Sequence, residues 1–435
     1  MPRSRTGATS RFHAASFSRR MPLVLTMTLQ TSRLFSALCG SFLCACGGAT
    51  RSNSPSQMPA SGAAASGSLQ APSSGAAAAA SLGANGGAAA AGATIVYVGS
   101  TNGQISLFQF DEFGAVAGKL TFVKSIAAGN YPSFLALDPA RAHLYAVNEP
   151  DAAVASFAVD PHSGDLTFLN RVASGGGSPA HISVDRAGHY VLVANYDGGT
   201  TRIFPIASDG SLGAPTNDQA PGKWSHMILT DPANHFVFVP NKGSDTVSQF
   251  VFDAAHGTLT PNRVPLVKTT AGAGPRHLAF HPNGKFAYVI DELDDTMSAY
   301  SYDAALGQLA WLQTVSTLPP GSDGTLNTCA EVLVAPSGNF VYGSNRGNDS
   351  IVTYSVDAAT GKLTYLGVTP SGGKVPRSFT LSPDGKVMLV ANESGNVVSF
   401  SVDVMSGKLQ PTSVVSAPVA PQFVGIVTLP GSAAR

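Results

Sequence analysis

The feature that most constrains the fold of this chain is an internal repeat. Within residues 94–428, a turn rich in Asp, Pro and Gly is followed by a run of aromatic and aliphatic residues, and this pattern recurs at intervals of 46 to 54 residues. The recurring turns begin at Asp138, Asp185, Asp231, His281, Ala335 and Ser382. Repeats of about 40 to 50 residues are typical of β-propellers, in which each repeat forms one blade.

A second turn pattern lies later in several repeats and reads Asp, three residues, Gly, one residue, Leu. It begins at Asp160, Asp253, Asp357 and Asp403. Glycine accepts the left-handed backbone conformation that tight turns need, so both patterns are expected to connect antiparallel strands. The segments between them, such as 190–194 and 236–239, are β-branched and aromatic with little helical period. The repeat therefore predicts four short strands per unit and almost no helix.

Counting the repeats predicts how the fold closes. Full units begin near Pro132, Pro179, Trp224, Pro275, Cys329 and Pro376. Residues 94–128 supply three strands of a further unit but lack its innermost strand, and residues 421–427 supply one strand of that missing kind. The sequence thus predicts an all-β, seven-bladed propeller with four antiparallel strands per blade. In it the C-terminal strand completes the first blade, so that no long sheet edge stays open.

The residues before the repeats have a different composition. Residues 1–93 contain seven Arg and no Lys, Asp or Glu. The apolar run from Leu34 to Cys46 spans 13 residues, which is too short for a membrane helix and typical of a signal-peptide core. Its end, Leu43-Cys44-Ala45-Cys46, resembles a bacterial lipobox, which predicts lipidation at Cys46. A cleaved, unlipidated signal is the alternative, and Met21 is a second candidate start.

These features predict three segments: a signal or lipoprotein-like leader (1–46), a disordered linker (47–93) and the propeller (94–431). The linker is rich in Ala, Gly and Ser and cannot bury enough apolar surface to fold. We therefore expect an exported protein of the bacterial cell envelope, periplasmic or on the surface, that meets a membrane only through the lipid anchor. Three of the four cysteines lie in the leader, so the propeller has no disulfide framework.

Charge limits the possible partners of the propeller. Without the seven arginines of the leader and linker, 19 basic residues face 26 acidic ones, a formal charge of −7. Nucleic-acid binding needs a basic face, so it is not expected. No phosphate-loop, serine-hydrolase or metal-ligand spacing is present, and a site without metal or cofactor is the expectation.

Equivalent positions in the repeats predict which side chains form a functional site, because the innermost strands of a propeller line one central channel. The third residue of each innermost strand is, in chain order, Phe134, His181, His226, His277, Glu331, Ser378 and Phe423. The turn after the second strand supplies a companion set: Glu149, Tyr196, Lys242, Glu292, Arg346 and Glu393. Arg276 stands beside His277. The ligand expected in this channel is a small lactone or another polar molecule.

Three motifs add a family resemblance to this pattern. Residues 274–282 read Gly-Pro-Arg-His-Leu-Ala-Phe-His-Pro, residues 193–199 read Val-Ala-Asn-Tyr-Asp-Gly-Gly, and residues 343–351 read Gly-Ser-Asn-Arg-Gly-Asn-Asp-Ser-Ile. Together they resemble the lactonase family of seven-bladed propellers, which includes bacterial 6-phosphogluconolactonase and fungal carboxy-muconate lactonizing enzyme. The similarity extends over residues 94–428. It implies a lactone-opening hydrolase whose catalytic residues are His226, Arg276, Glu292 and Arg346.

Two departures from the family pattern leave the substrate open. Asn241-Lys242 replaces Asp-Leu, and Asp291 stands where Asn is usual; both positions are expected on the channel rim. The export leader is a third departure, and it argues against a phosphorylated intracellular substrate.

Lactone opening needs a base that activates water and cations that hold the developing oxyanion. Glu292 or His226 is the expected base, and Arg276 and Arg346 are the expected cations. The residues expected to contact substrate are His181, Tyr196, His277 and Glu331. The alternatives are that Glu292 and the arginines form a structural ion-pair network, and that His181 and Tyr196 only bond neighbouring backbone or channel water. The alternative function is a non-catalytic envelope propeller that binds protein, glycan or cell-wall ligands.

Overall fold

The computed structural model of the chain describes residues 93–111, 118–417 and 419–430. All of them belong to one compact unit, 83–435. The predicted leader, Cys46 and all but the last residue of the predicted linker lie outside the described residues. Within the described part, the regular elements are all strands, and no helix there is long and apolar enough to cross a membrane.

The described residues form 28 strands, and these pair into seven sheets of four. Their bounds are β1 (Thr94–Ser100), β2 (Gln104–Asp111), β3 (Lys119–Ala127), β4 (Pro132–Leu137), β5 (His143–Asn148), β6 (Ala153–Val159), β7 (Leu166–Ala173), β8 (Pro179–Val184), β9 (Tyr190–Asn195), β10 (Thr200–Pro205), β11 (Asn217–Gln219), β12 (Leu229–Thr230), β13 (Phe236–Asn241), β14 (Thr246–Asp253), β15 (Thr258–Lys268), β16 (Pro275–Phe280), β17 (Phe286–Asp291), β18 (Thr296–Asp303), β19 (Gln308–Ser316), β20 (Cys329–Val334), β21 (Phe340–Asn345), β22 (Ser350–Val356), β23 (Leu363–Pro370), β24 (Pro376–Leu381), β25 (Val387–Asn392), β26 (Asn396–Val402), β27 (Leu409–Ser416) and β28 (Pro421–Thr428).

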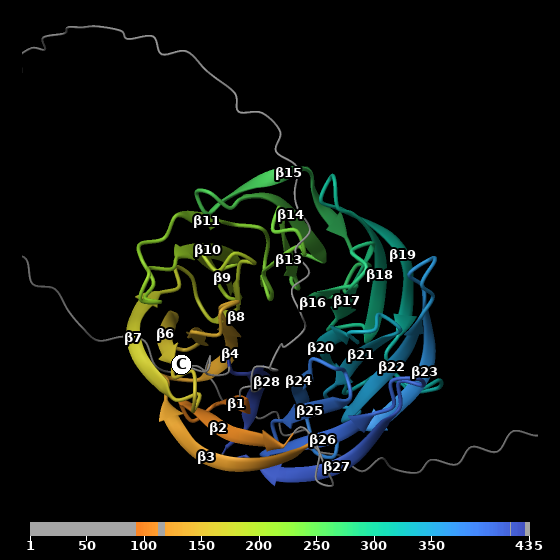
Figure 1. Ribbon diagram of the computed structural model, residues 1–435. Helices are drawn as coiled ribbons and strands as arrows, with labels where there is room; N and C mark the ends of the chain where they lie inside the picture. The colour runs from red at the N-terminus through yellow and green to blue at the C-terminus, as the bar shows by residue number, and fades with distance from the viewer. Residues whose placement is uncertain (1–92, 112–117, 418, 431–435) are drawn as a thin grey trace, which may run out of the picture. The chain divides into compact units, whose positions relative to one another are not determined.

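The sheets are the blades of a propeller. Six of them are built from four strands consecutive in the chain, every described pairing is antiparallel, and Figure 1 shows the sheets arranged around a central opening. Strands such as β3, β19 and β27 lie at the perimeter, while β4, β16 and β24 lie next to the opening. The predicted all-β, seven-bladed propeller is confirmed.

The first blade is closed by the C-terminal strand, as the blade count predicts. Its strand order is β28-β1-β2-β3. Thr94 pairs with Thr428 at one end of the β1–β28 ladder, and Gly99 pairs with Phe423 near the other. The two ends of the propeller sequence are therefore held in one sheet, and β28 also contacts the innermost strands on either side, β24 and β4.

The innermost strand of the fourth blade is shorter than the repeat predicts. It was expected to begin near Trp224, but β12 contains only Leu229 and Thr230. Trp224 has a left-handed backbone conformation (φ 56°), as do Tyr131, Ser178 and Val375 directly before the innermost strands of three other blades, so it takes the position before the strand and not its first residue. Ser225 forms only an isolated bridge with Asn241, so His226 reaches the channel from an irregular segment.

The hydrophobic core is divided among the contacts between blades. Along β1 successive side chains point to opposite faces of the sheet. Tyr97 packs against Leu144 of the second blade, whereas Val96 packs against Leu389 of the last blade; all four side chains are fully buried. Second strands such as β1 are apolar on both faces because each face meets another blade, and this explains their continuous apolar runs.

Hydrogen bonds between neighbouring blades supplement this packing. The Tyr288 hydroxyl donates to the carbonyl of Gly361 at 3.1 Å, in the hairpin turn of the next blade, and that glycine has the left-handed φ (69°) predicted for the turn. Gln313 donates from Nε2 to the Leu363 carbonyl (3.1 Å) and accepts the Leu363 N–H at Oε1 (2.8 Å). The second turn pattern of the sequence thus marks the contact between successive blades.

Candidate active site

A polar cavity of about 300 Å³ lies where the central channel meets the turns that follow the second strands. Its lining residues come from six blades and are Glu149, Ser178, Ala180, Tyr196, Asp197, His226, Lys242, Glu292, Arg346 and Arg377. Five of the six turn residues expected from the sequence line the cavity, namely the residue directly after β5, β9, β13, β17 and β21, whereas Glu393 after β25 does not.

Buried amides hold these turns in place. The last residue of most second strands is a fully buried Asn whose side chain donates to a carbonyl of the preceding connection. Asn148 donates to Ala128 at 2.9 Å, and Asn345 donates to Thr317 at 2.9 Å. In the fifth blade this position is Asp291, which instead accepts from the Ser298 hydroxyl at 2.8 Å. Burial raises the pKa of Asp291 to about 7, and its side chain does not line the cavity, although it was expected on the rim.

Glu292 is the centre of a cluster of three cations. Its Oε1 lies 2.6 Å from Lys242 Nζ and 2.9 Å from an Arg346 Nη, and its Oε2 lies 3.1 Å from Arg276 Nε. Burial by itself raises the pKa of Glu292, but the three positive charges outweigh burial and bring this pKa down to about 2. Glu292 is therefore ionised throughout the physiological pH range, and both of its oxygens are occupied.

The two arginines of the cluster differ in access to the cavity. Arg346 lines it, with one Nη donating to the Cys329 carbonyl at 3.0 Å. Arg276 is only 2% exposed and does not line the cavity, and its Nη1 donates to the Ala330 carbonyl at 2.6 Å. Burial lowers the pKa of Arg276 to about 9, which leaves the guanidinium charged at neutral pH. Arg346 can therefore contact a ligand directly, while Arg276 supports Glu292 from behind.

His226 is the lining residue with a free ring nitrogen. Its Nδ1 is buried and has no hydrogen-bond partner among the described residues. Burial, followed by the charge of Arg276, holds the pKa of His226 well below its usual value. The imidazole is therefore neutral at pH 7 and can accept a proton. Its ring packs edge to face against Tyr196, with ring centroids 5.6 Å apart.

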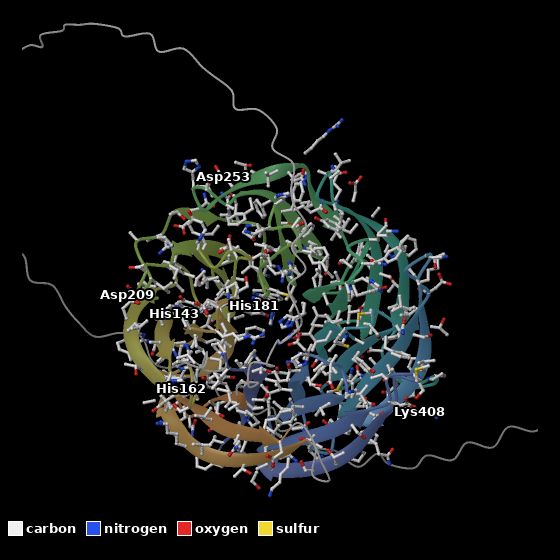
Figure 2. All side chains as sticks on the ribbon, viewed as in Figure 1. His143, His162, His181, Asp209, Asp253 and Lys408 are labelled. Atoms are coloured by element: carbon white, nitrogen blue, oxygen red, sulfur yellow. The ribbon has the colours of Figure 1, made fainter. Side chains whose placement is uncertain are left out.

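The four residues predicted to contact substrate are placed at two levels. Tyr196 lines the cavity, whereas His181, His277 and Glu331 are buried outside its lining. His277 Nδ1 lies 2.8 Å from Glu331 Oε1, and Figure 2 shows His181 beside the central opening. Burial raises the pKa of Glu331 to about 7 and lowers that of His277. His277 in turn contacts two residues of the site: its Nε2 lies 3.2 Å from Arg276 Nη1, and its ring centroid lies 5.1 Å from that of His226.

The sequence reasoning did not single out Arg377, Asp197 or Ser178, which also line the cavity. The signal for Arg377 was present, because Pro376-Arg377 at the start of β24 repeats Pro275-Arg276 at the start of β16. Asp197 and Ser178 carry no comparable signal. They meet only through the fold, where the Ser178 hydroxyl donates to the Asp197 carboxylate at 2.5 Å.

Comparison with known proteins agrees with the family resemblance of the sequence motifs. Residues 95–424 match the family model described as lactonase, 7-bladed β-propeller. A Bacillus subtilis protein named 6-phosphogluconolactonase is 34% identical over 349 residues, which cover 76% of this chain and 98% of the relative. A protein of the same name from Pectobacterium carotovorum is 32% identical over 337 residues, covering 77% of this chain and 99% of the relative.

A solved structure also matches. The periplasmic gluconolactonase PpgL of Pseudomonas aeruginosa is 28% identical to this chain and superposes with a TM-score of 0.71. The match covers 78% of this chain and 99% of that protein. The resemblance that the sequence motifs indicated is therefore confirmed over the whole propeller.

Proposed function

The chain belongs to the lactonase family of seven-bladed β-propellers, and from this premise we propose that it is a hydrolase that opens a sugar or small hydroxy-acid lactone in the cavity beside Glu292. One observation carries the proposal. Cations held by Glu292 and the neutral imidazole of His226 line the same cavity. These are the two components that lactone hydrolysis needs, because negative charge develops on the carbonyl oxygen while water loses a proton.

In this mechanism Arg346 and Lys242 bind the carbonyl oxygen of the lactone. Both line the cavity, and both are held by Glu292 Oε1, at 2.9 and 2.6 Å. A cation fixed before the reaction stabilises the oxyanion without the cost of reorganising during it. Glu292 is then a positioning residue, since a carboxylate with a pKa of about 2 is a weak base.

His226 is the base. Water gives its proton to the imidazole of His226, and its oxygen bonds to the carbonyl carbon to form the tetrahedral oxyanion. The bond from this carbon to the ring oxygen then breaks, and the leaving oxygen takes the proton from His226. The product is the open hydroxy acid, and the imidazole returns to its neutral form. Of the two bases that the sequence left open, His226 is favoured because burial keeps its imidazole neutral, whereas both Glu292 oxygens are held by cations.

The test of this function is a panel of sugar and hydroxy-acid lactones with the purified protein, corrected for spontaneous hydrolysis. The wild type is expected to open at least one of them well above background. Arg346→Ala should lower turnover roughly 10²-fold, which is the usual cost of one lost oxyanion donor. If no lactone on the panel is opened above background, the alternative of a non-catalytic envelope propeller gains support.

We also propose that the protein is exported and anchored through Cys46, which lies outside the described residues. The lipobox-like Leu43-Cys44-Ala45-Cys46 and the periplasmic naming of the Pseudomonas aeruginosa protein support this proposal. A single acyl chain anchors weakly and dual or triple acylation anchors firmly, so Cys46→Ser should move the protein from the membrane fraction to the soluble fraction. Cys44→Ser is the matched control and should leave fractionation unchanged. Equal membrane association of wild type and Cys46→Ser would contradict the anchor.

A further inference from the structure

A second charge cluster lies at the same cavity, which two of its three residues line, and it is built by other blades than the Glu292 cluster. It consists of Arg377 on β24, Glu149 after β5 and Glu393 after β25. Arg377 lies 3.7 Å from Glu149 Oε1 and 3.5 Å from Glu393 Oε1. The mechanism proposed above does not use these three side chains.

The ion-pair contacts of this cluster are longer than those of the Glu292 cluster, and its side chains are more exposed to solvent. Contacts of 3.5 and 3.7 Å are charge attraction rather than good hydrogen bonds, so the guanidinium keeps donors for a ligand. The side chains of Arg377, Glu149 and Glu393 are 19, 21 and 30% exposed, against 8% for Glu292. Glu149 Oε1 is buried and forms no hydrogen bond with the described residues. The cluster thus offers unused donors of Arg377 beside the partly exposed carboxylates of Glu149 and Glu393.

The charge of the cluster decides which ligand it suits. Two carboxylates face one guanidinium, so the local charge is negative. The cavity lining as a whole has no surplus of positive charge either, because Lys242, Arg346 and Arg377 are matched by Glu149, Asp197 and Glu292. A phosphate group would bring about two negative charges to a site whose cations are already matched by carboxylates, and like charges at short range cost binding energy. A hydroxyl group can instead donate to Glu149 and accept from Arg377.

We infer that Arg377, Glu149 and Glu393 form a distal subsite that binds the hydroxyl-bearing end of an unphosphorylated sugar lactone and rejects a phosphorylated one. The inference rests on the proposed function, since it places the lactone carbonyl at Arg346 and Lys242. Beyond the proposed function, the inference states that the site selects unphosphorylated over phosphorylated lactones. It assigns this selectivity to residues outside the Glu292 cluster.

The test compares kcat/KM for D-glucono-1,5-lactone and for its 6-phosphate. We expect the wild type to favour the unphosphorylated lactone by roughly tenfold or more. Glu149→Gln and Glu393→Gln keep the side-chain size but remove one negative charge each, and the double variant should shift this ratio roughly tenfold toward the phosphorylated lactone. The matched control is Asp218→Asn on the outermost strand β11, where the same chemical change affects a surface ion pair with Arg202.

Three results would overturn the inference: a wild type that prefers the phosphorylated lactone, a ratio unchanged in the double variant, or an equal shift in Asp218→Asn. Failure of the proposed function is a separate outcome, in which the wild type hydrolyses neither lactone. Titration calorimetry with gluconate and 6-phosphogluconate then still tests the subsite. Tighter binding of gluconate by the wild type, lost in the double variant, would support it, and equal binding would refute it.

Discussion

A chain that ends at Val419, and so lacks β28, is expected to lose the folded propeller. The truncation removes the innermost strand of the first blade and leaves β1 with an open edge. It also removes Val424, Val427 and Leu429, which are at most 6% exposed. Three buried aliphatic side chains contribute about 5 to 8 kcal/mol, which is comparable to the whole stability of a typical domain of about 5 to 15 kcal/mol. Circular dichroism and thermal denaturation measure the loss.

The position of β28 beside β1 also allows the stability of the truncated chain to be restored. Thr428 pairs with Thr94, and the Leu429 N–H donates to the Ala93 carbonyl at 2.9 Å. A permuted chain in which 419–430 precede 93–417 through a short turn should therefore restore the blade as a hairpin and recover the wild-type melting temperature. A chain that ends at Pro430 is the control and should melt like the wild type. If the chain ending at Val419 melts within a degree or two of the wild type, the blade closure is wrong.

His226→Gln is expected to lower kcat/KM for the lactone by roughly 10² to 10⁴, the usual contribution of a positioned general base. Glutamine preserves the polarity and approximate size of the side chain but cannot take a proton from water. Tyr196→Phe is the matched control in the same cavity, because it keeps the ring that packs against His226 and removes only a hydroxyl. Steady-state kinetics on the best lactone of the panel, with melting temperatures for each variant, measure both effects.

The pH profile identifies the base. A neutral imidazole is required, and burial lowers the pKa of His226, so the neutral form persists below the ordinary imidazole range. Activity should therefore stay constant as the pH falls to about 6.5 and decline only in more acidic solution. Glu292→Gln should reduce turnover but retain an acid limb, because its role is to hold the cations. If the acid limb disappears in Glu292→Gln and remains in His226→Gln, Glu292 is the base.

The fold was predictable because the information for it is local and repeated. Each blade carries its own turn signals, such as the Pro-Asp-Gly turn at Ser382 and the Gly361 hairpin, and each second strand is apolar because both of its faces are covered. Repetition also placed Glu292, Arg346 and Tyr196 at equivalent positions, so their convergence followed from ring symmetry. The shortness of β12 was not predicted from the repeat.

The chemistry of the site was decided by distances that cross between blades. Sequence position made Glu292 and His226 equal candidates for the base. The fold brings three cations onto Glu292 and leaves His226 with a free nitrogen. It also buries Arg276 behind the cavity that Arg346 lines.

What the sequence by itself determined is therefore the number of blades, the strand that closes the ring, and most of the turn residues that line the cavity. Only the tertiary structure decided which of those side chains pair, which stay open to a ligand, and that Arg377, Glu149 and Glu393 gather as a second cluster. The physical reason is the range of the forces. Turn conformation and strand patterning act over a few neighbouring residues and are written along the chain. Ion pairing and burial depend on separations of a few ångströms between residues as far apart in sequence as Glu149 and Arg377, and these exist only in the closed ring.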